Sequence, residues 1–431
     1  MNTLDVTALG VGAMIGAGVF VLTGMAVGEA GPALTLAFVL NGAIALIVGA
    51  CYAELAAMMP KAGGAYIWAQ SGLGPFFGFF SGWMSSFAQL IACSLYAAAF
   101  GAFAQKLLSD VTGRGFSDLL KVVISVGLLV MLLWVNFRGA GKVGKAEVLI
   151  TGIKIAILLV VIAFGLHLLF NSSSKMTSFT PFFPHGIGGL MSAMGITFVA
   201  FEGYEIIVQT GEEVKRPEST IPRAIFISIV IAVVIYVLVA VVMLGAVKAP
   251  EGQTVYGYLG QLKELGLMKA AGQFVPYGEI ILLVAGLAST ASALNATIYG
   301  SSRIVFAMGR AGDLPPLIGR VHRTQKTPHI ALAVAGILMI VMTVVLPIKD
   351  IAASTNIMFL LVFVMVCTTV IRMRVIWPDR ERPFRVPLSP WFPILGILSG
   401  LVLSVWLLRV SLIAWLVAFG WLVLGGAVFI Y

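Results

Sequence analysis

Long runs of apolar residues, separated by short polar segments, dominate the pattern along this chain. The runs 34–58, 147–170, 222–247 and 391–408 are almost free of charge. Each has about twenty residues, the helix length that crosses a hydrocarbon layer of about 30 Å. They lack the strict alternation of membrane β-strands. Because backbone polar groups in a bilayer must bond within the protein, the pattern predicts an all-α integral membrane fold.

Twelve such runs lie between polar breaks, and each predicts one transmembrane helix. They cover residues 7–25, 34–58, 76–107, 119–136, 147–170, 187–208, 222–247, 277–308, 329–346, 351–370, 391–408 and 410–430. The longest segment between them, 248–276, is rich in glycine and weakly amphipathic, so we expect short helices there that cap the membrane domain. The first run has no basic leader and carries glycines at its centre, which favours a span over a cleavable signal peptide.

Basic residues are distributed unevenly between the two sets of loops. With the N-terminus inside the cell, seventeen of the 27 Lys and Arg residues fall in cytoplasmic loops and nine in the opposite loops. Because cytoplasmic loops of membrane proteins are enriched in Lys and Arg, we expect a multi-pass protein of the cell membrane with both termini cytoplasmic. This placement accounts for the net charge of +9. No nucleic-acid partner is therefore expected, and membrane lipid is the partner that a basic face would meet.

Residues for catalysis or metal binding are sparse. Cys51, Cys93 and Cys367 fall inside apolar runs and are interpreted as small packing residues without disulfides. The four histidines lack metal-ligand spacing, and no P-loop is present, so neither a metal, a cofactor nor an ATPase of its own is expected. The sequence has no cluster of catalytic residue types, so a membrane enzyme is not expected. A channel with uncoupled flux stays open as an alternative.

The first and sixth runs carry residues that an ordinary membrane helix avoids. Residues 10–18 read GVGAMIGAG, and residues 198–205 read FVAFEGYE, with a glycine and two carboxylates. These runs are five apart in order, as are the third and eighth, which are the two longest. The spacing predicts two inverted repeats, 1–170 and 187–372, followed by an appended helix pair, 390–431. A binding site is then expected near the midplane, between the two broken helices.

The glycines of the first run have a competing interpretation, because Gly12 and Gly16 form a GxxxG pair suited to close helix packing. Irregular segments at matching positions of the two halves favour unwinding instead. A broken helix exposes N–H groups that can hold a carboxylate and carbonyls that can hold an ammonium, so a zwitterion fits between them. The expected N–H donors are Gly16, Ala17 and Gly18, and the expected carbonyl acceptors are Met14, Ile15, Val199 and Ala200.

Five stretches of the chain resemble the amino acid–polyamine–organocation (APC) superfamily of permeases. They are GAMIGAGVF in the first run, YAELAAMMPKAGGAYIW at 52–68, FVAFEGYE in the sixth run, GEEVKRPESTIPRAI at 211–225, and SALNATIYGSSRIVFAMGRAGDLP at 292–315. The resemblance implies a leucine-transporter-like inverted-repeat fold. It also implies uptake or exchange of amino acids by alternating access, with an amino acid as the substrate.

The same resemblance assigns roles by position. Ile15, Gly16, Ala17 and Gly18 match the residues that hold the α-carboxylate, and the stretch from Val199 to Glu202 matches the part that meets the α-amino group and the side chain. Phe201 matches an aromatic gate, and Glu205 stands where several relatives carry an acid. Glu202 stands where relatives usually have an apolar residue. The candidate substrate contacts of the sixth run are Phe198, Val199, Ala200, Phe201, Glu202 and Glu205.

Glu202 and Glu205 have three possible roles. They could bind a cationic substrate side chain, take part in proton movement, or hydrogen-bond to backbone groups freed by the helix break. The first role would make the protein an exchanger of cationic amino acids or polyamines, which is the main alternative to a general amino acid transporter.

Lys154 lies one or two turns into the fifth run, where it either reaches back to the cytoplasmic surface or is buried. In the APC resemblance, some proton-coupled members carry a lysine here whose ammonium occupies the place of sodium elsewhere in the fold. That place would be lined by carbonyls of the first span and by the hydroxyls of Ser289 or Ser292. A desolvated lysine can release and regain its proton, so we expect proton coupling rather than sodium coupling.

Other polar residues in the runs have simpler expected roles. Glu54 and Lys61, at the cytoplasmic end of the second run, are expected to be interface charges or members of gate-forming ion pairs. Asn41, Asn295 and Asn356 are expected to make polar contacts between helices.

Overall fold

A computed structural model describes residues 1–16, 18–61, 63–138, 143–171, 178–322, 324–325 and 327–430, with only the backbone for 143–147. All the regular secondary structure in these residues is helical. The α-helices are α1 (Thr3–Met14), α2 (Thr23–Ala30), α3 (Leu34–Met58), α4 (Ala65–Leu73), α5 (Pro75–Thr112), α6 (Asp118–Phe137), α7 (Val143–Phe170), α8 (Gly186–Thr197), α9 (Tyr204–Gln209), α10 (Pro217–Ala246), α11 (Val255–Gln261), α12 (Gly266–Phe274), α13 (Gly278–Ala311), α14 (His329–Val345), α15 (Ile348–Ile376), α16 (Trp391–Val410) and α17 (Leu412–Ile430).

In the described part of the chain, the following short segments have tighter or wider helical turns. One is a π-helix, η1 (Gly18–Leu22), and the others are 3₁₀ turns: η2 (Gly31–Ala33), η4 (Phe198–Phe201), η5 (Gly211–Glu213) and η6 (Lys263–Leu265). Two of them, η1 and η4, interrupt the first and sixth apolar runs. Such departures from α geometry inside a helix are frequent at functional sites.

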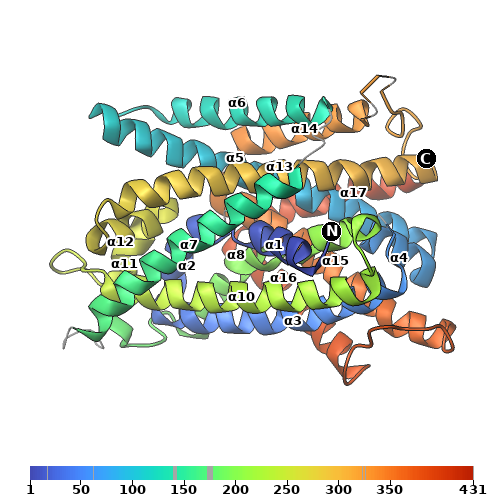
Figure 1. Cartoon of the computed structure of the whole chain (residues 1–431), viewed down its shortest axis with the longest axis horizontal. Coiled ribbons are helices and arrows are strands. Elements are labelled where there is room, and N and C mark those ends of the chain that lie inside the picture. The colour runs from blue at the N-terminus through green and yellow to red at the C-terminus, as the bar shows by residue number, and fades with distance from the viewer. Residues whose placement is uncertain are drawn as a thin grey trace.

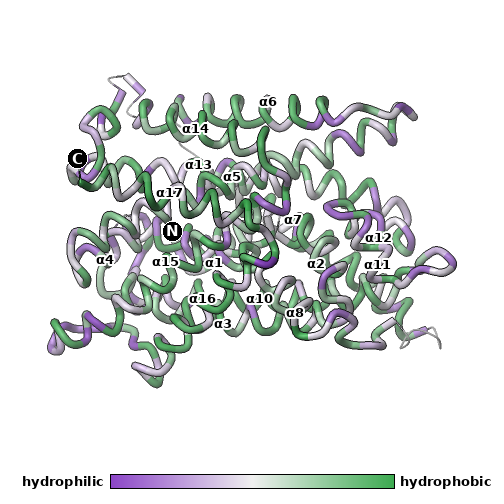
Figure 2. Tube along the Cα trace, turned by 180° about the vertical axis from the view of Figure 1, so that it is seen from behind, coloured by the Kyte–Doolittle hydropathy of each residue, from purple (hydrophilic) through white to green (hydrophobic). Residues whose placement is uncertain are grey.

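The long helices run side by side along the long axis of the molecule (Figure 1). α5 packs against α13 and α15, and α3 packs against α10. The short helices α1 and α8 lie near the centre of both views, among these long helices (Figures 1 and 2). The interrupted segments are therefore surrounded by the rest of the fold.

The distribution of apolar surface indicates that the helices lie in a membrane. Ten helical segments of the described chain are long and apolar enough to span it. Large apolar side chains such as Val130, Met131 and Trp134 of α6 and Leu398 and Val405 of α16 are exposed, as lipid-facing residues must be. Figure 2 shows the hydrophilic segments gathered mainly at the two ends of the long axis. The molecule is an integral membrane protein of helices.

Several helix ends differ from the apolar runs that predicted them. α10 begins at Pro217, a favourable first position, and includes Pro222, where the run begins. α4 follows the second run and was not predicted. The segment 248–276 does form short helices, α11 and α12, so that expectation is confirmed. Both drawn chain ends lie toward the end of the molecule that carries α4 (Figures 1 and 2).

Candidate functional site

The first helix break lies between α1 and η1. α1 ends at Met14, and Ile15 leaves the helical region with φ −78° and ψ 53°. Its N–H still bonds to the carbonyl of Val11, but the chain then resumes as a π turn at Gly18. Ala17, one of the predicted N–H donors, lies outside the described residues. The helix is therefore interrupted at this glycine-rich segment and does not continue as an unbroken packing helix.

Three carbonyls at the end of α1 accept hydrogen bonds from side chains of other helices. Lys154 Nζ on α7 donates to the carbonyl of Gly12 at 3.1 Å. Ser289 Oγ on α13 donates to the carbonyl of Ile15 at 2.7 Å. The hydroxyl of Tyr236 on α10 lies 2.6 Å from the carbonyl oxygen of Met14. The carbonyls that the break leaves without intrahelical partners are thus bonded through three separate helices.

The second break, between α8 and α9, is supported in a similar way. α8 ends at Thr197 and passes through η4 and a turn at Glu202 and Gly203. Two asparagines bind the last carbonyls of α8: Asn41 Nδ2 donates to Met194 O at 3.0 Å, and Asn356 Nδ2 donates to Gly195 O at 2.6 Å and Ile196 O at 3.0 Å. These contacts, with Asn136 Nδ2 donating to Asn295 Oδ1 at 2.8 Å, confirm the interhelical role expected of the three asparagines.

The two breaks lie in direct backbone contact. A Cβ placed on Gly18 would lie 2.7 Å from Cα of Ala200, and a Cβ on Gly203 would lie 2.6 Å from the backbone nitrogen of Met14. No side chain fits at such distances, so only glycine permits this approach. The hydroxyl of Tyr236 lies 2.8 Å from the carbonyl oxygen of Ala200 as well as near Met14. Its single proton can serve only one of these two carbonyls at a time.

Aromatic rings enclose the second break. Phe201 packs against Phe38 and Tyr236, with ring centroids 6.4 and 5.1 Å away. Phe198 packs against Phe363 at 6.0 Å. Phe198, Val199, Ala200 and Phe201 are all buried. The second break is therefore closed to solvent in this conformation.

A small cavity of about 20 Å³ lies beside the two breaks. It is lined by residues of α1, α5, α9, α13 and α15, and its polar lining consists of Gln89, Tyr96, Glu202, Glu205 and Thr297. Its volume suits one group of the size of a water molecule. A larger molecule would enter only after the helices around it move apart.

The two carboxylates of the cavity differ in their contacts. Glu205 Oε1 accepts a hydrogen bond from the hydroxyl of Tyr52 on α3, and Glu205 Oε2 accepts one from Gln89 Nε2 on α5 at 3.4 Å. Neither carboxylate oxygen of Glu202 has a hydrogen-bond partner within the described chain, although both are buried. Among the described residues, neither acid hydrogen-bonds to backbone groups freed by the break, which was one of the three possible roles.

Lys154 is buried, with only 1% of the residue exposed. It therefore does not reach back to the surface, and that alternative is wrong. Its ammonium lies beside the end of α1, where Ser289 also donates, so these two predicted residues do meet the first break. Ser292 is also buried on α13.

The sequence of the chain matches a known protein family. A family model described as amino acid permease matches residues 1–428 of this chain. The chain belongs to the amino acid permease family. This membership confirms the family resemblance of the five sequence stretches, and it makes the protein a transport protein rather than an enzyme.

The permease is similar to several characterised proteins over most of its length. It is 29% identical to the branched-chain amino acid permease BcaP of Bacillus subtilis, covering 99% of this chain and 91% of the relative. It is 28% identical to the methylthioribose transporter of the same organism, covering 100% and 92%. It is also 29% identical to cationic amino acid transporter 4 of Mus musculus, covering 87% of this chain and 59% of that protein.

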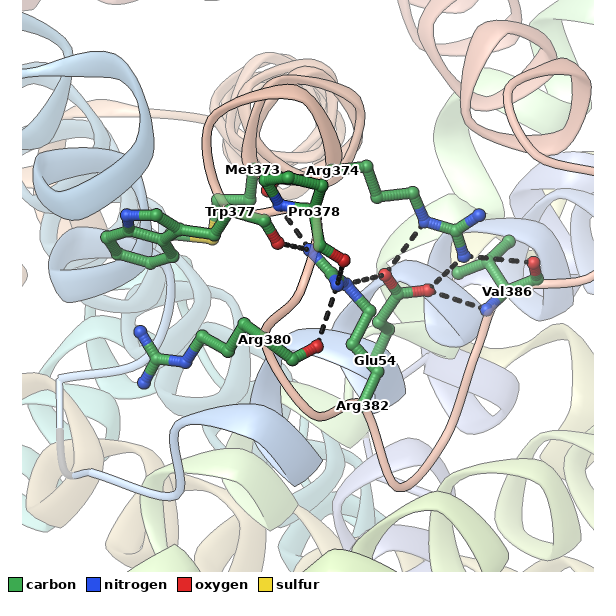
Figure 3. Close-up of polar contacts among 8 residues, drawn as sticks. All are labelled: Glu54, Met373, Arg374, Trp377, Pro378, Arg380, Arg382 and Val386. Carbon is green, nitrogen blue, oxygen red and sulfur yellow. Dashed lines mark hydrogen bonds and ion pairs between the residues drawn. The ribbon is translucent and has the colours of Figure 1, made fainter.

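A third buried acid of the permease lies at the C-terminal end of α3. Glu54 is 1% exposed and accepts hydrogen bonds from Arg374 Nε at 3.0 Å, from Arg374 Nη2 at 2.5 Å and from the backbone N–H of Val386 at 2.6 Å. Arg382 Nε lies 3.4 Å from Glu54 Oε1. Figure 3 shows the carboxylate enclosed by these groups. Glu54 is thus a member of a buried ion-pair cluster and not an interface charge, whereas Lys61 is exposed.

Arg382 also closes the end of α15. Its two terminal nitrogens donate to the carbonyls of Met373, Trp377, Pro378 and Arg380 (Figure 3). One guanidinium therefore bonds the last turn of α15 and the following loop while facing Glu54 of α3. Sequence reasoning missed Tyr236, Gln89 and Tyr52 because their partners lie far away in the sequence. It missed Arg382 because Glu54 is also distant.

Proposed function

We propose that the permease is a secondary active transporter that carries amino acids across the cell membrane by alternating access, with the proton as the coupling ion. The observation that carries the proposal is the direct contact of the two helix breaks around Gly18 and Ala200. Ala13 near the end of α1 and Glu202 and Gly203 at the second break line the same small cavity. Paired broken helices of this kind form the midplane substrate sites of secondary transporters.

The proposed architecture has twelve spans arranged as two inverted repeats of five, residues 1–170 and 187–372, and an appended pair, 390–431. Among the ten apolar segments, Thr3–Met58 has room for two spans, and the 17-residue helix His329–Val345 adds another. The two breaks fall in the first and sixth spans, and the longest α-helices, α5 and α13, are the third and eighth. With an even number of spans and the basic loops inside, both termini are cytoplasmic.

The substrate is held at its two charged ends. The N–H groups that follow the first break, at Gly16 and Gly18 and at Ala17 between them, bind the α-carboxylate. Carbonyls at Met14, Ile15, Val199 and Ala200 take the α-ammonium. Because Tyr236 has one proton for two carbonyls, either Met14 or Ala200 keeps an acceptor for the substrate. Phe201 closes over the bound molecule from the side of Phe38.

Lys154 couples transport to the proton. While charged, its ammonium holds the carbonyl of Gly12 and fills the region in which a sodium ion would otherwise meet the carbonyls of the first break. Loss of the proton removes a charge whose burial is costly and weakens the hold on α1, which then moves to release the substrate. Ser289 and Ser292 of α13 complete this coupling region.

The coupling proposal is tested with Lys154→Gln in proteoliposomes that carry an imposed pH gradient. The variant is expected to lose proton-driven accumulation of a radiolabelled amino acid while it still exchanges labelled for unlabelled substrate. Lys248→Gln, at an exposed lysine, is the matched control and is expected to accumulate substrate as the unaltered protein does. Unimpaired pH-driven accumulation by Lys154→Gln would refute proton coupling through this residue.

The alternative, an exchanger of cationic amino acids or polyamines, uses the same fold and the same backbone contacts. It differs in the substrate group that Glu202 contacts. Because a polyamine lacks a carboxylate, it leaves the N–H groups of the first break without a charged partner. The two-break geometry therefore favours amino acids, neutral or cationic, over polyamines.

A further inference from the structure

The small cavity beside the two breaks is lined by buried hydrogen-bond acceptors that have no partner in the described chain. Neither carboxylate oxygen of Glu202 has a partner in the described chain, and the side-chain oxygen of Gln89 has none either. Both residues line the cavity, and Glu202 is only 6% exposed. The lining contains no lysine or arginine among its described residues. Three buried acceptors therefore surround a space with no cation to satisfy them.

Glu205 does not share this deficit. The hydroxyl of Tyr52 and the amide of Gln89 bind its two oxygens, so its carboxylate is satisfied by the protein itself. Glu202 lies three residues earlier, at the turn of the second break. The carboxylate of Glu205 is thus hydrogen-bonded by protein side chains, whereas that of Glu202 has no hydrogen-bond partner in the described chain.

Protonation does not remove the deficit at Glu202. A protonated carboxyl has one O–H donor, and the residues that line the cavity would then have to accept it while the second oxygen still lacked a donor. An isolated buried carboxylate is costly, and a group that brings several N–H donors and a positive charge offsets that cost best. A primary ammonium has three donors and is about as large as the group that the cavity holds.

We propose that Glu202 and Gln89 form a side-chain subsite for the terminal ammonium of a diamino acid, so that the permease prefers substrates with a cationic side chain. This inference rests on the proposed amino acid transport and names its substrate class. The α-carboxylate and α-ammonium remain at the backbone groups of the two breaks. Glu202 faces the same cavity as Gln89 and Tyr96 of α5, so the subsite extends from the breaks toward α5.

The test compares substrates that differ only in the end of the side chain. Ornithine and norleucine have side chains of equal length, one ending in an ammonium and the other in a methyl group, and 2,4-diaminobutyrate and norvaline form a shorter pair. Uptake of all four is measured in proteoliposomes for the unaltered permease, for Glu202→Gln, and for Glu218→Gln as a charge-matched control at an exposed position. Binding to the unaltered protein is measured in parallel by thermal stabilisation in detergent.

The expected result is a preference of about tenfold or more for each cationic member in the unaltered permease and in Glu218→Gln, as a hydrogen-bonded charge pair provides. Glu202→Gln is expected to lose that preference, so that uptake of the two members of each pair becomes about equal. Equal transport of both members by the unaltered protein would overturn the subsite while leaving amino acid transport intact. Equal loss of all four substrates in folded Glu202→Gln would overturn it too, because Glu202 would then serve the α-ammonium.

If Glu202→Gln does not fold, the binding measurement on the unaltered protein still decides. Stronger stabilisation by ornithine than by norleucine supports the subsite, and equal stabilisation refutes it. Absence of both transport and binding for every amino acid would contradict the proposed function itself.

Discussion

Glu54 and Glu202 are both carboxylates buried in the helical core, 1% and 6% exposed, yet their surroundings are opposite. Glu54 receives three hydrogen bonds and a further guanidinium contact from Arg374, Arg382 and Val386. Glu202 receives none within the described chain. Burial alone therefore does not identify the role of an acid in a membrane protein. The partners distinguish the two acids: Glu54 joins α3 to α15 and the following loop, whereas Glu202 keeps the acceptors on which the proposed subsite depends.

The largest effect on stability is expected at Glu54. Glu54→Gln leaves two guanidinium groups in a largely buried site without their counter-charge, and loss of one partner from such a cluster costs about 3–5 kcal/mol of stability. We expect a large fall in the unfolding temperature of the purified protein in detergent. The matched control is Glu264→Gln, whose pair with Lys121 at 3.3 Å is more exposed and is worth at most about 1 kcal/mol. Equal effects of the two substitutions would contradict a structural role for the Glu54 cluster.

The same substitution at Glu202 is expected to change stability in the other direction. Glu202→Gln replaces a buried carboxylate that lacks a donor by a neutral amide, which costs less to bury. The gain should be about 1–3 kcal/mol, the penalty of an unsatisfied polar group. The unfolding temperature without substrate should therefore rise. A fall comparable to that of Glu54→Gln would show that Glu202 is held by the fold after all.

Tyr236 permits a test of the central region that does not involve an acid. Tyr236→Phe removes the donor that serves the carbonyls of Met14 and Ala200. The expected loss of stability is about 1–2 kcal/mol, with reduced uptake because the two breaks lose their shared contact. Thermal unfolding and uptake are measured on the same preparation. Unchanged uptake would mean that this hydroxyl does not set the position of the breaks.

The smallest expected effect is at Asn136, away from both acids. Asn136→Ala removes the hydrogen bond to Asn295 between α6 and α13, and such contacts are worth about 0.6 kcal/mol on average in membrane proteins. A slight fall in unfolding temperature with normal uptake is expected. A loss as large as that of Glu54→Gln would show that interhelical amides contribute as much as buried ion pairs in this protein.

The positions of the helices were predictable because each apolar run has the length and composition of a span. The two breaks were also predictable, since glycines at 10–18 and the acids in FVAFEGYE conflict with an ordinary membrane helix. The partners of the breaks were not. Tyr236 lies 222 residues from Met14, and Arg374 lies 320 residues from Glu54, so only the packed structure brings them together.

The apolar runs did not predict every helix end correctly. α10 starts five residues before its apolar run because the polar first turn at Pro217 still has a favourable helix start. The difference between Glu202 and Glu205 could not be derived from their sequence either. It depends on Tyr52 and Gln89, which two other helices bring to Glu205 and not to Glu202.

The most direct test of the account is accumulation of a radiolabelled amino acid panel in proteoliposomes with proton and sodium gradients imposed separately. We expect accumulation that is driven by the proton gradient alone, abolished by a protonophore and unaffected by removal of sodium. Accumulation that requires sodium would contradict the role of Lys154. Absence of accumulation under either gradient, with binding intact, would contradict secondary active transport.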